Sequence, residues 1–232
     1  MRLLLFALLL SPGLGAADPL ATAGPTDEDL AYSINWPTGL SLGEAHLRTA
    51  HKKTDAGDRW ETEFTIDAAV PGFQVLDRVR SIASGDFCSI QLEKSYTHGK
   101  RKTEETTRFD QQAGRATRET KGGGKTEFNI SNCARDALDY LQYLRRELSL
   151  GRLPPHQTVY YGAPYNVSVQ FAGTQTIRVS EVPMEADRLV VTLKGPQVDI
   201  SFEAFFAKEP SRKPVLVRVP FSLATFSMEL VR

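Results

Sequence analysis

Hydrophobic and polar residues alternate along most of this chain, which is the pattern of β-strands that bury one face. The clearest early example is 30–36, where Leu30, Tyr32, Ile34 and Trp36 stand at every second position. Short strands at regular spacing, with Gly, Pro or charged turns between them, predict an antiparallel meander. The further predicted strands are 40–48, 60–68, 75–82, 87–96, 102–109, 114–120, 127–130, 158–161, 165–171, 175–179, 188–193, 198–205, 215–219 and 224–230.

One stretch, 132–151, has a different period. Its apolar residues recur every three or four positions, which is the stripe of an amphipathic helix. The pattern predicts a helix over 134–148, with Asn132 as the N-cap and Gly151 as the stop. Because this is the one helix that the pattern indicates, no βαβ order is expected. The stripe consists of Ala134, Ala137, Leu138, Leu141, Leu144 and Leu148.

These elements predict a single β-rich domain over 29–232. The chain has 232 residues, of which 41% are hydrophobic, so it can bury a sizeable core. We see neither an internal repeat nor a linker that would separate two domains. The expected fold is mostly β: a curved antiparallel sheet or open β-barrel, with the one helix packed in its concavity.

The N-terminus has the features of an export signal. Arg2 precedes the apolar run 3–10, and small residues follow, so 1–17 is predicted to be a signal peptide and 18–28 a flexible leader. The apolar run is too short for a membrane-spanning helix, and no later run approaches about 20 apolar residues. The expected location of the mature chain is therefore periplasmic or secreted, without a transmembrane segment. A lipoprotein anchor is not expected, because no Cys follows the run.

Two cysteines remain, Cys88 and Cys133. An even count in an exported chain favours a disulfide over two buried thiols. Loop closure would then contribute about 4 kcal/mol to stability for a loop of this length. A zinc site is not expected from two cysteines without nearby histidines.

The mature chain resembles a known family, the bacterial exported proteins grouped as domain-of-unknown-function 3108. The resemblance lies in the alternating strand 30–36 with the following 39–43, in the helix segment Asp136-Ala-Leu-Asp-Tyr-Leu-Gln-Tyr-Leu-Arg145 with Gly151 after it, and in Arg212-Lys-Pro214. It implies a curved sheet wrapped partly around a helix, similar to the periplasmic lipoprotein-localisation carriers. It implies no particular activity.

Catalytic signatures do not appear. The four histidines are isolated from one another, no serine stands in a Gly-x-Ser-x-Gly elbow, and nothing points to a paired-carboxylate site. We therefore expect no catalytic residue, no metal and no cofactor. The formal net charge is zero, which gives no reason to expect nucleic acid as a partner.

Two features could contact a ligand or partner. The first is a basic patch, Lys100, Arg101 and Lys102, in a segment (94–125) with nine Lys/Arg and four Asp/Glu. It is either an ordinary solvated hairpin or a docking edge for an anionic lipid headgroup, glycan or acidic partner.

The second feature is Arg145, which falls inside the apolar stripe of the helix, while Arg146 and Glu147 should point outward. Arg145 could have a structural role, in which it extends its charged end to the rim or bonds strand-end carbonyls or a carboxylate, or it could meet an acidic ligand group at the mouth of a cavity. The other candidate ligand contacts are Tyr140, Leu141 and Trp60.

Three functions remain. The first is a non-enzymatic carrier or binding protein for a lipid, lipoprotein or other apolar ligand, which rests on the open-barrel expectation and on the fold analogy. The second is an envelope-assembly scaffold that acts through protein contacts. The third and least favoured is an enzyme with a dispersed site. An apolar cavity beside the helix would favour the first, and a convergent His, Asp and Glu cluster would favour the third.

Overall fold

The computed structural model describes residues 24–231, except 56, 71–72, 197–198 and 221–223. The predicted signal peptide and the first part of the leader lie outside the described residues. At the end of the predicted leader, Glu28 already belongs to the first strand. Among the described residues, no helix combines the length and apolar character needed to cross a bilayer.

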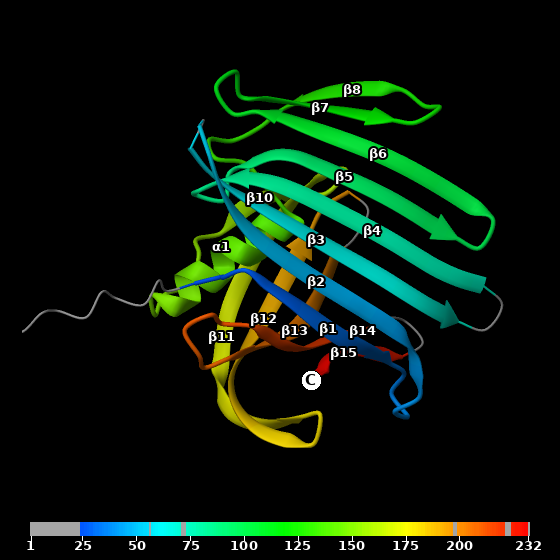
Figure 1. Ribbon diagram of the computed structural model, residues 1–232, viewed down its shortest axis with the longest axis vertical. Coiled ribbons are helices and arrows are strands. Elements are labelled where there is room, and N and C mark those ends of the chain that lie inside the picture. Colours follow the sequence, from blue (N-terminus) through cyan, green and yellow to red (C-terminus); the bar gives the residue numbers. More distant parts are fainter. Residues whose placement is uncertain (1–23, 56, 71–72, 197–198, 221–223, 232) are drawn as a thin grey trace, which may run out of the picture.

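The described chain folds into one long, strongly curved sheet and one helix, α1, which covers the concave side near one end (Figure 1). The predicted mostly-β fold is thereby confirmed. The elements are β1 (Glu28–Asn35), β2 (Ser41–Thr54), β3 (Gly57–Val70), β4 (Phe73–Ser84), β5 (Ser89–His98), β6 (Arg101–Asp110), β7 (Arg115–Thr120), β8 (Lys125–Asn129), β9 (Arg135–Asp136), α1 (Ala137–Ser149), β10 (Gln157–Tyr160), β11 (Pro164–Val179), β12 (Val182–Lys194), β13 (Asp199–Ala207), β14 (Pro214–Pro220) and β15 (Thr225–Val231).

The strand order is β8-β7-β6-β5-β4-β3-β2-β1-β15-β14-β13-β12-β11-β10-β9. From β1 to β8 and from β10 to β15, strands that follow one another in the chain pair antiparallel, and β1 joins the two halves by pairing with β15. One pairing differs: β9 runs parallel to β10, with Arg135 opposite Val159, and α1 connects them. The expectation that no βαβ order occurs is therefore wrong for this short unit, because a two-residue strand is too short to show any periodicity.

The sheet stays open, and the seam lies between β9 and β5. The Ser89 amide donates to the Ala134 carbonyl at 2.9 Å, and the side chain of Gln111 fills the space beside this bond. Its Nε2 donates to the carbonyls of Ser89 (2.7 Å) and Ala134 (3.0 Å), and its Oε1 accepts from the Ala134 amide (3.0 Å). One side chain thus satisfies backbone groups that a continuous ladder would otherwise pair.

The helix begins later than the sequence pattern predicts. It runs from Ala137 to Ser149, and Asp136, not Asn132, is its N-cap. Cys133 has a φ of 51° and Ala134 is bonded to β5, so the chain is not yet helical there. The predicted stop is confirmed, because Gly151 follows the C-cap with a φ of 73°, a conformation that glycine adopts readily.

Candidate functional site

The concave side of the sheet and the inner face of α1 enclose an apolar cavity of about 270 Å³. Strands from both halves of the sheet contribute side chains to it, because the curvature turns their inner faces toward one point. The helix contributes Ala137, Leu138, Tyr140, Leu141 and Leu144. The strands contribute Tyr32, Leu47, Phe64, Val159, Val167, Val191, Leu193, Phe202, Ala204, Phe206, Pro214, Val217 and Met228.

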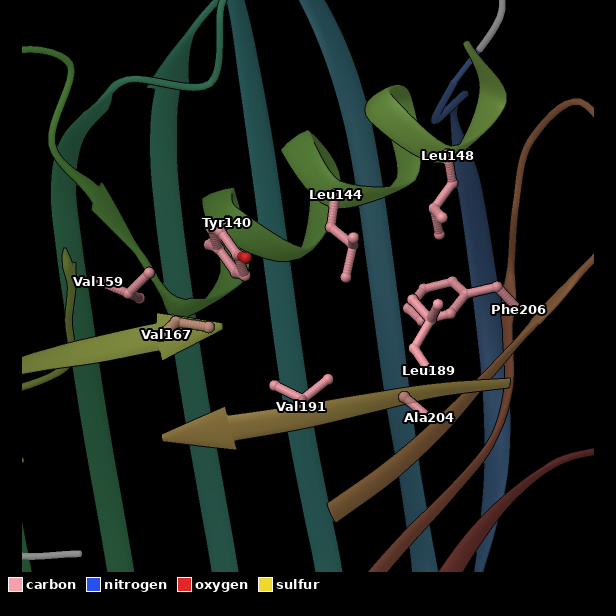
Figure 2. Packing of buried hydrophobic residues seen from close by; sticks show 9 residues of the cluster. All are labelled: Tyr140, Leu144, Leu148, Val159, Val167, Leu189, Val191, Ala204 and Phe206. Carbon is pink, nitrogen blue, oxygen red and sulfur yellow. The ribbon is translucent and has the colours of Figure 1, made fainter. Parts of the chain in front are cut away.

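The residues directly below the helix form a packed layer. Leu144 and Leu148 point from α1 toward Leu189 and Phe206 on the strands (Figure 2). This layer is buried: Leu144 is 3% exposed and Leu189 0%. It closes the cavity at the helix end and holds the helix stripe against the sheet.

Exposure of the inward side chains rises with distance from the helix. Along β12, Leu189 is 0% exposed and Val191 6%, whereas Leu193 is only half-buried. Along β13, Phe206 is 1% exposed, whereas Phe202 is half-buried. The cavity is therefore closed toward the helix and open at the opposite end of the sheet.

We call this open end the mouth rim. Strand register places the turns after β1, β5 and β12 at this end, since Asn35 pairs with Ser41, His98 with Arg101, and Lys194 with Asp199. In Figure 1 the β5–β6 turn lies far from α1, at the opposite end of the strands. The mouth rim and the helix are thus opposite ends of one interior.

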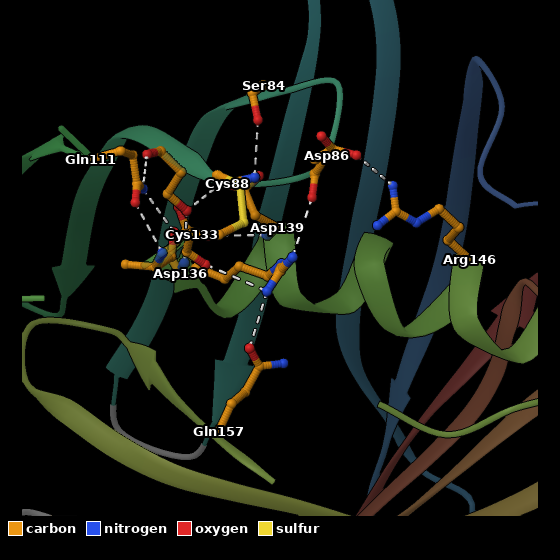
Figure 3. The surroundings of a disulfide bond; sticks show 12 residues. Ser84, Asp86, Cys88, Gln111, Cys133, Asp136, Asp139, Arg146 and Gln157 are labelled. Atoms are coloured by element: carbon orange, nitrogen blue, oxygen red, sulfur yellow. Dashed lines mark hydrogen bonds and ion pairs between the residues drawn. A yellow bond between two sulfur atoms is a disulfide. The ribbon is translucent and has the colours of Figure 1, made fainter. Parts of the chain in front are cut away.

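A disulfide fastens the N-terminal end of the helix segment. Cys88, just before β5, is bonded to Cys133, with a Cα–Cα distance of 4.6 Å, so the predicted bridge is confirmed (Figure 3). Cys133 lies in the turn before the helix instead of in its first turn. Nearby, Arg135 donates to the Asp86 carbonyl and to the Gln157 side chain.

Two buried aspartates belong to this end of the helix, Asp136 as its N-cap and Asp139 in its first turn, and the sequence did not suggest this pair. Asp136 and Asp139 are both 0% exposed. The Ser81 hydroxyl contacts both carboxylates, at 2.7 Å from Asp139, and the Ser89 hydroxyl also contacts both. Asp136 also accepts from the Leu138 amide at 2.8 Å, as an N-cap does.

Burial is the main cause that raises the pKa of Asp139 well above its usual range, and the negative charge of Asp136 raises it further. The pKa of Asp136 is also raised, mainly by burial, although bonds to Ser81 and to backbone amides act in the opposite direction. Because two buried carboxylates lie close together and their negative charges repel, the pair holds a proton more readily than a single carboxyl would, although the bonds from Ser81 and Ser89 act in the opposite direction. The Asp-x-x-Asp spacing was visible in the sequence, but only the fold places Ser81 and Ser89 beneath it.

Arg145 is 0% exposed, and its guanidinium is bonded within the protein. Nε and Nη2 donate to the Ser211 carbonyl at 3.1 and 2.9 Å, and Nε also reaches the Arg212 carbonyl at 3.2 Å. Nη1 contacts the Glu28 carboxylate and donates to Gln142 Oε1 at 2.9 Å. Of the two alternatives for Arg145, these contacts match the one in which it bonds strand-end carbonyls and a carboxylate.

The candidate ligand contacts predicted from the sequence do not all lie at the cavity. Tyr140 and Leu141 line the cavity, whereas Trp60 and Arg145 are not among the described residues that line it. The ring of Trp60 lies 5.3 Å from that of Phe87. Glu147, expected to point outward, is 5% exposed and pairs with Arg152, so that expectation is wrong.

The basic patch of Lys100, Arg101 and Lys102 is exposed at the β5–β6 turn, on the mouth rim. Of the histidines, His46 and His51 lie on β2, His98 ends β5 beside the basic patch, and His156 precedes β10. His98 contacts Asp77 at 2.8 Å, and within the described ranges no three His, Cys, Asp or Glu side chains gather as a metal site would require.

Known proteins share the sequence pattern and the fold of this chain. The family described as "Protein of unknown function (DUF3108)" matches residues 31–231. A beta-barrel-like protein of the DUF1849 domain from Brucella abortus has a similar structure, with a TM-score of 0.65 over 90% of this chain and 98% of that one, at 8% sequence identity. A putative exported protein with a YmcC-like fold from Bacteroides fragilis gives a TM-score of 0.41 at 11% identity, over 91% and 98% of the two chains. No curated protein matches the sequence.

Proposed function

The chain belongs to the DUF3108 family of proteins of unknown function, and from its cavity we propose that it is a non-enzymatic binding or carrier protein for an apolar ligand. The observation that carries this proposal is the space between α1 and the sheet. It is lined by aliphatic and aromatic side chains, and it is open at the mouth rim and closed at the helix. Binding pockets for small molecules are typically concave, mostly apolar and preformed.

The size and chemistry of the cavity define the ligand class. Its 270 Å³ are close to the lower end of the range of about 300–1,000 Å³ for small-molecule sites. No charged side chain is among the described lining residues. The cavity therefore suits a single hydrocarbon chain whose polar end stays at the mouth rim, in preference to a bulky ligand that enters whole.

The buried acidic pair supports a non-enzymatic function. Asp136 and Asp139 are fully covered, and their partners are the helix N-terminus and two serines of the sheet. A catalytic acid or base must come within hydrogen-bonding reach of a substrate, and these carboxyls have no exposed face. We assign them to holding the helix. With the export signal expected over 1–17, we place the carrier in the periplasm.

Titration with cis-parinaric acid, a fluorescent fatty acid, tests the proposal. The native chain should bind the probe saturably, because the probe's chain leaves water for the apolar cavity. Val217→Phe puts a ring into the cavity near its half-buried edge and should weaken binding at least tenfold.

Val231→Phe makes the same chemical change at a position that is 43% exposed and outside the lining, so it should leave the affinity unchanged. Absence of saturable binding by the native chain, or equal affinity in the two variants, would contradict the proposal. Recovery of hydrocarbon-chain lipids by mass spectrometry from the chain purified out of the periplasm would support both its ligand class and its location.

A further inference from the structure

Two turns on the mouth rim expose opposite kinds of surface. The β1–β2 turn is apolar at its tip, where Leu40 is 65% exposed. The turn is held in place: the Trp36 amide donates to the Leu40 carbonyl at 2.9 Å and the Gly39 amide to the Trp36 carbonyl at 2.8 Å. The Trp36 ring also packs edge-on against Phe226, with centroids 4.8 Å apart. The exposed leucine is thus presented by a fixed turn.

The β5–β6 turn carries the three adjacent cations of the basic patch. Most other basic residues of the hairpins β5 to β8 have an acidic partner on the same or a neighbouring strand. The pairs are Lys94–Glu105 (2.6 Å), Lys121–Glu104 (2.8 Å), Arg108–Glu119 (3.4 Å) and Lys125–Glu127 (3.8 Å). In the described part of the chain, Lys100, Arg101 and Lys102 have no acidic partner of this kind, so the tip keeps a net positive charge.

We propose that the mouth rim docks on an anionic lipid membrane, with Leu40 entering the interface and the basic patch contacting the headgroups. This inference rests on the proposed function, because docking would set the open end of the cavity against the bilayer. Transfer of a leucine side chain out of water lowers the free energy, and tryptophan is enriched in the interfacial layer of membranes. Cations near an anionic surface are attracted over about a Debye length.

The two turns can reach one flat surface together. Gly43 of β2 pairs with Ala68 of β3, and Val75 of β4 pairs with His98 of β5. The intervening strands therefore end at a common level, and both turns project from the same end of the sheet. The helix and its fastenings lie at the other end, away from the docked surface (Figure 1).

Vesicle flotation tests the proposal. The native chain should float with vesicles made of equimolar phosphatidylcholine and phosphatidylglycerol, and binding should weaken as salt is added. It should bind pure phosphatidylcholine vesicles far less. Replacing Lys100, Arg101 and Lys102 together by Gln should lower the affinity for the mixed vesicles about a hundredfold, at roughly fivefold for each charge.

A matched control removes three charges at the helix end. Lys52 and Lys53 lie at the end of β2, and Lys208 follows β13; all three are exposed. Their replacement by Gln changes the net charge equally and should leave vesicle affinity within about twofold. Leu40→Ser should lower the affinity about tenfold or more, at any salt concentration.

The proposal is overturned if the native chain fails to float with the mixed vesicles, if both triple variants lose affinity equally, or if Leu40→Ser binds like the native chain. Its failure can be distinguished from failure of the proposed function. The rim variants should bind cis-parinaric acid in solution normally, because none of their residues lines the cavity. Val217→Phe should lose the probe and still float.

Discussion

Arg145 allows the sharpest test of how α1 is held. Replacing it by Met removes five donor groups but keeps an unbranched side chain that can fill the same channel. The Glu28 carboxylate, which is 7% exposed, would then lose its cation while it stays buried. The carbonyls of Ser211 and Arg212, and the side chain of Gln142, would lose their donors as well.

Breaking a buried ion pair by removing one partner costs about 3–5 kcal/mol. That is a large share of the roughly 5–15 kcal/mol by which most domains are stable. For a chain of this size it corresponds to a fall in Tm of roughly 6–20 °C, at about 2–4 °C for each kcal/mol. We expect Arg145→Met to fold with this loss of stability.

Urea unfolding followed by circular dichroism, with the disulfide intact, measures the loss as a lower midpoint at unchanged slope. Arg146→Met is the matched control one residue along. Its ion pairs are long, 3.4 Å to Asp86, which is 85% exposed, and 3.9 Å to Glu147, so its removal should cost about 1 kcal/mol or less.

A double variant separates the charge from the packing. Glu28→Gln combined with Arg145→Met removes the carboxylate that would be stranded, so the pair should cost at least about 1 kcal/mol less than the sum of the single changes. The reasoning fails if the two single changes simply add, or if Arg145→Met costs no more than Arg146→Met.

Three further predictions concern the acidic pair, the disulfide and a tightly packed glycine. Asp139→Asn should remove a pH dependence of the free energy of unfolding, because the pKa of Asp139 is raised in the fold: its contribution to stability is complete below about pH 4 and is lost as pH rises through the raised pKa. A stability difference between native chain and variant that stayed constant with pH would contradict this. Changing Cys88 and Cys133 together to Ser should lower the free energy of unfolding by about 4 kcal/mol, as measured by urea unfolding. A loss below about 1 kcal/mol would contradict the loop-closure explanation. Gly43→Ala should cost about 1–3 kcal/mol in the same measurement, because its Cβ would lie 2.1 Å from the Asp67 carbonyl, whereas Gly124→Ala, with nothing within 4 Å of its Cβ, should be nearly neutral.

The alternating pattern was sufficient to predict the sheet, because half-buried strands repeat every two residues whichever strands they pair with. The stripe was sufficient to predict that one helix packs on the concave side, with Arg145 as its polar exception. The helix start was not predictable, because the disulfide at Cys133 and the Ala134 bond to β5 hold this segment in a non-helical conformation although its apolar residues continue the helical stripe.

The burial of Asp136 and Asp139 could not be predicted from the sequence either. Asp136 and Asp139 occupy positions where exposed acidic residues commonly stabilise a helix N-terminus, so their spacing reads as an ordinary cap. Only the register of β4 with β5, which sets Ser81 beside Leu92 and brings Ser89 close, shows that both carboxyls are covered. Likewise, the sequence indicates an apolar interior, but whether that interior keeps a space depends on how closely the two halves of the sheet approach.

The positions of the contacts that hold α1 indicate how a ligand would enter the cavity. The disulfide, the acidic pair and the Arg145 contacts all lie at the helix end, and each joins α1 or the segment before it to the sheet or to the strand ends. Displacing the helix would break several buried polar contacts at once, each costing roughly 1–3 kcal/mol. The inward residues at the mouth rim, such as Leu193 and Phe202, are half-buried and can change rotamer at much lower cost. In the proposed carrier, therefore, the ligand enters and leaves through the mouth rim while the helix stays fixed as the closed end of the cavity.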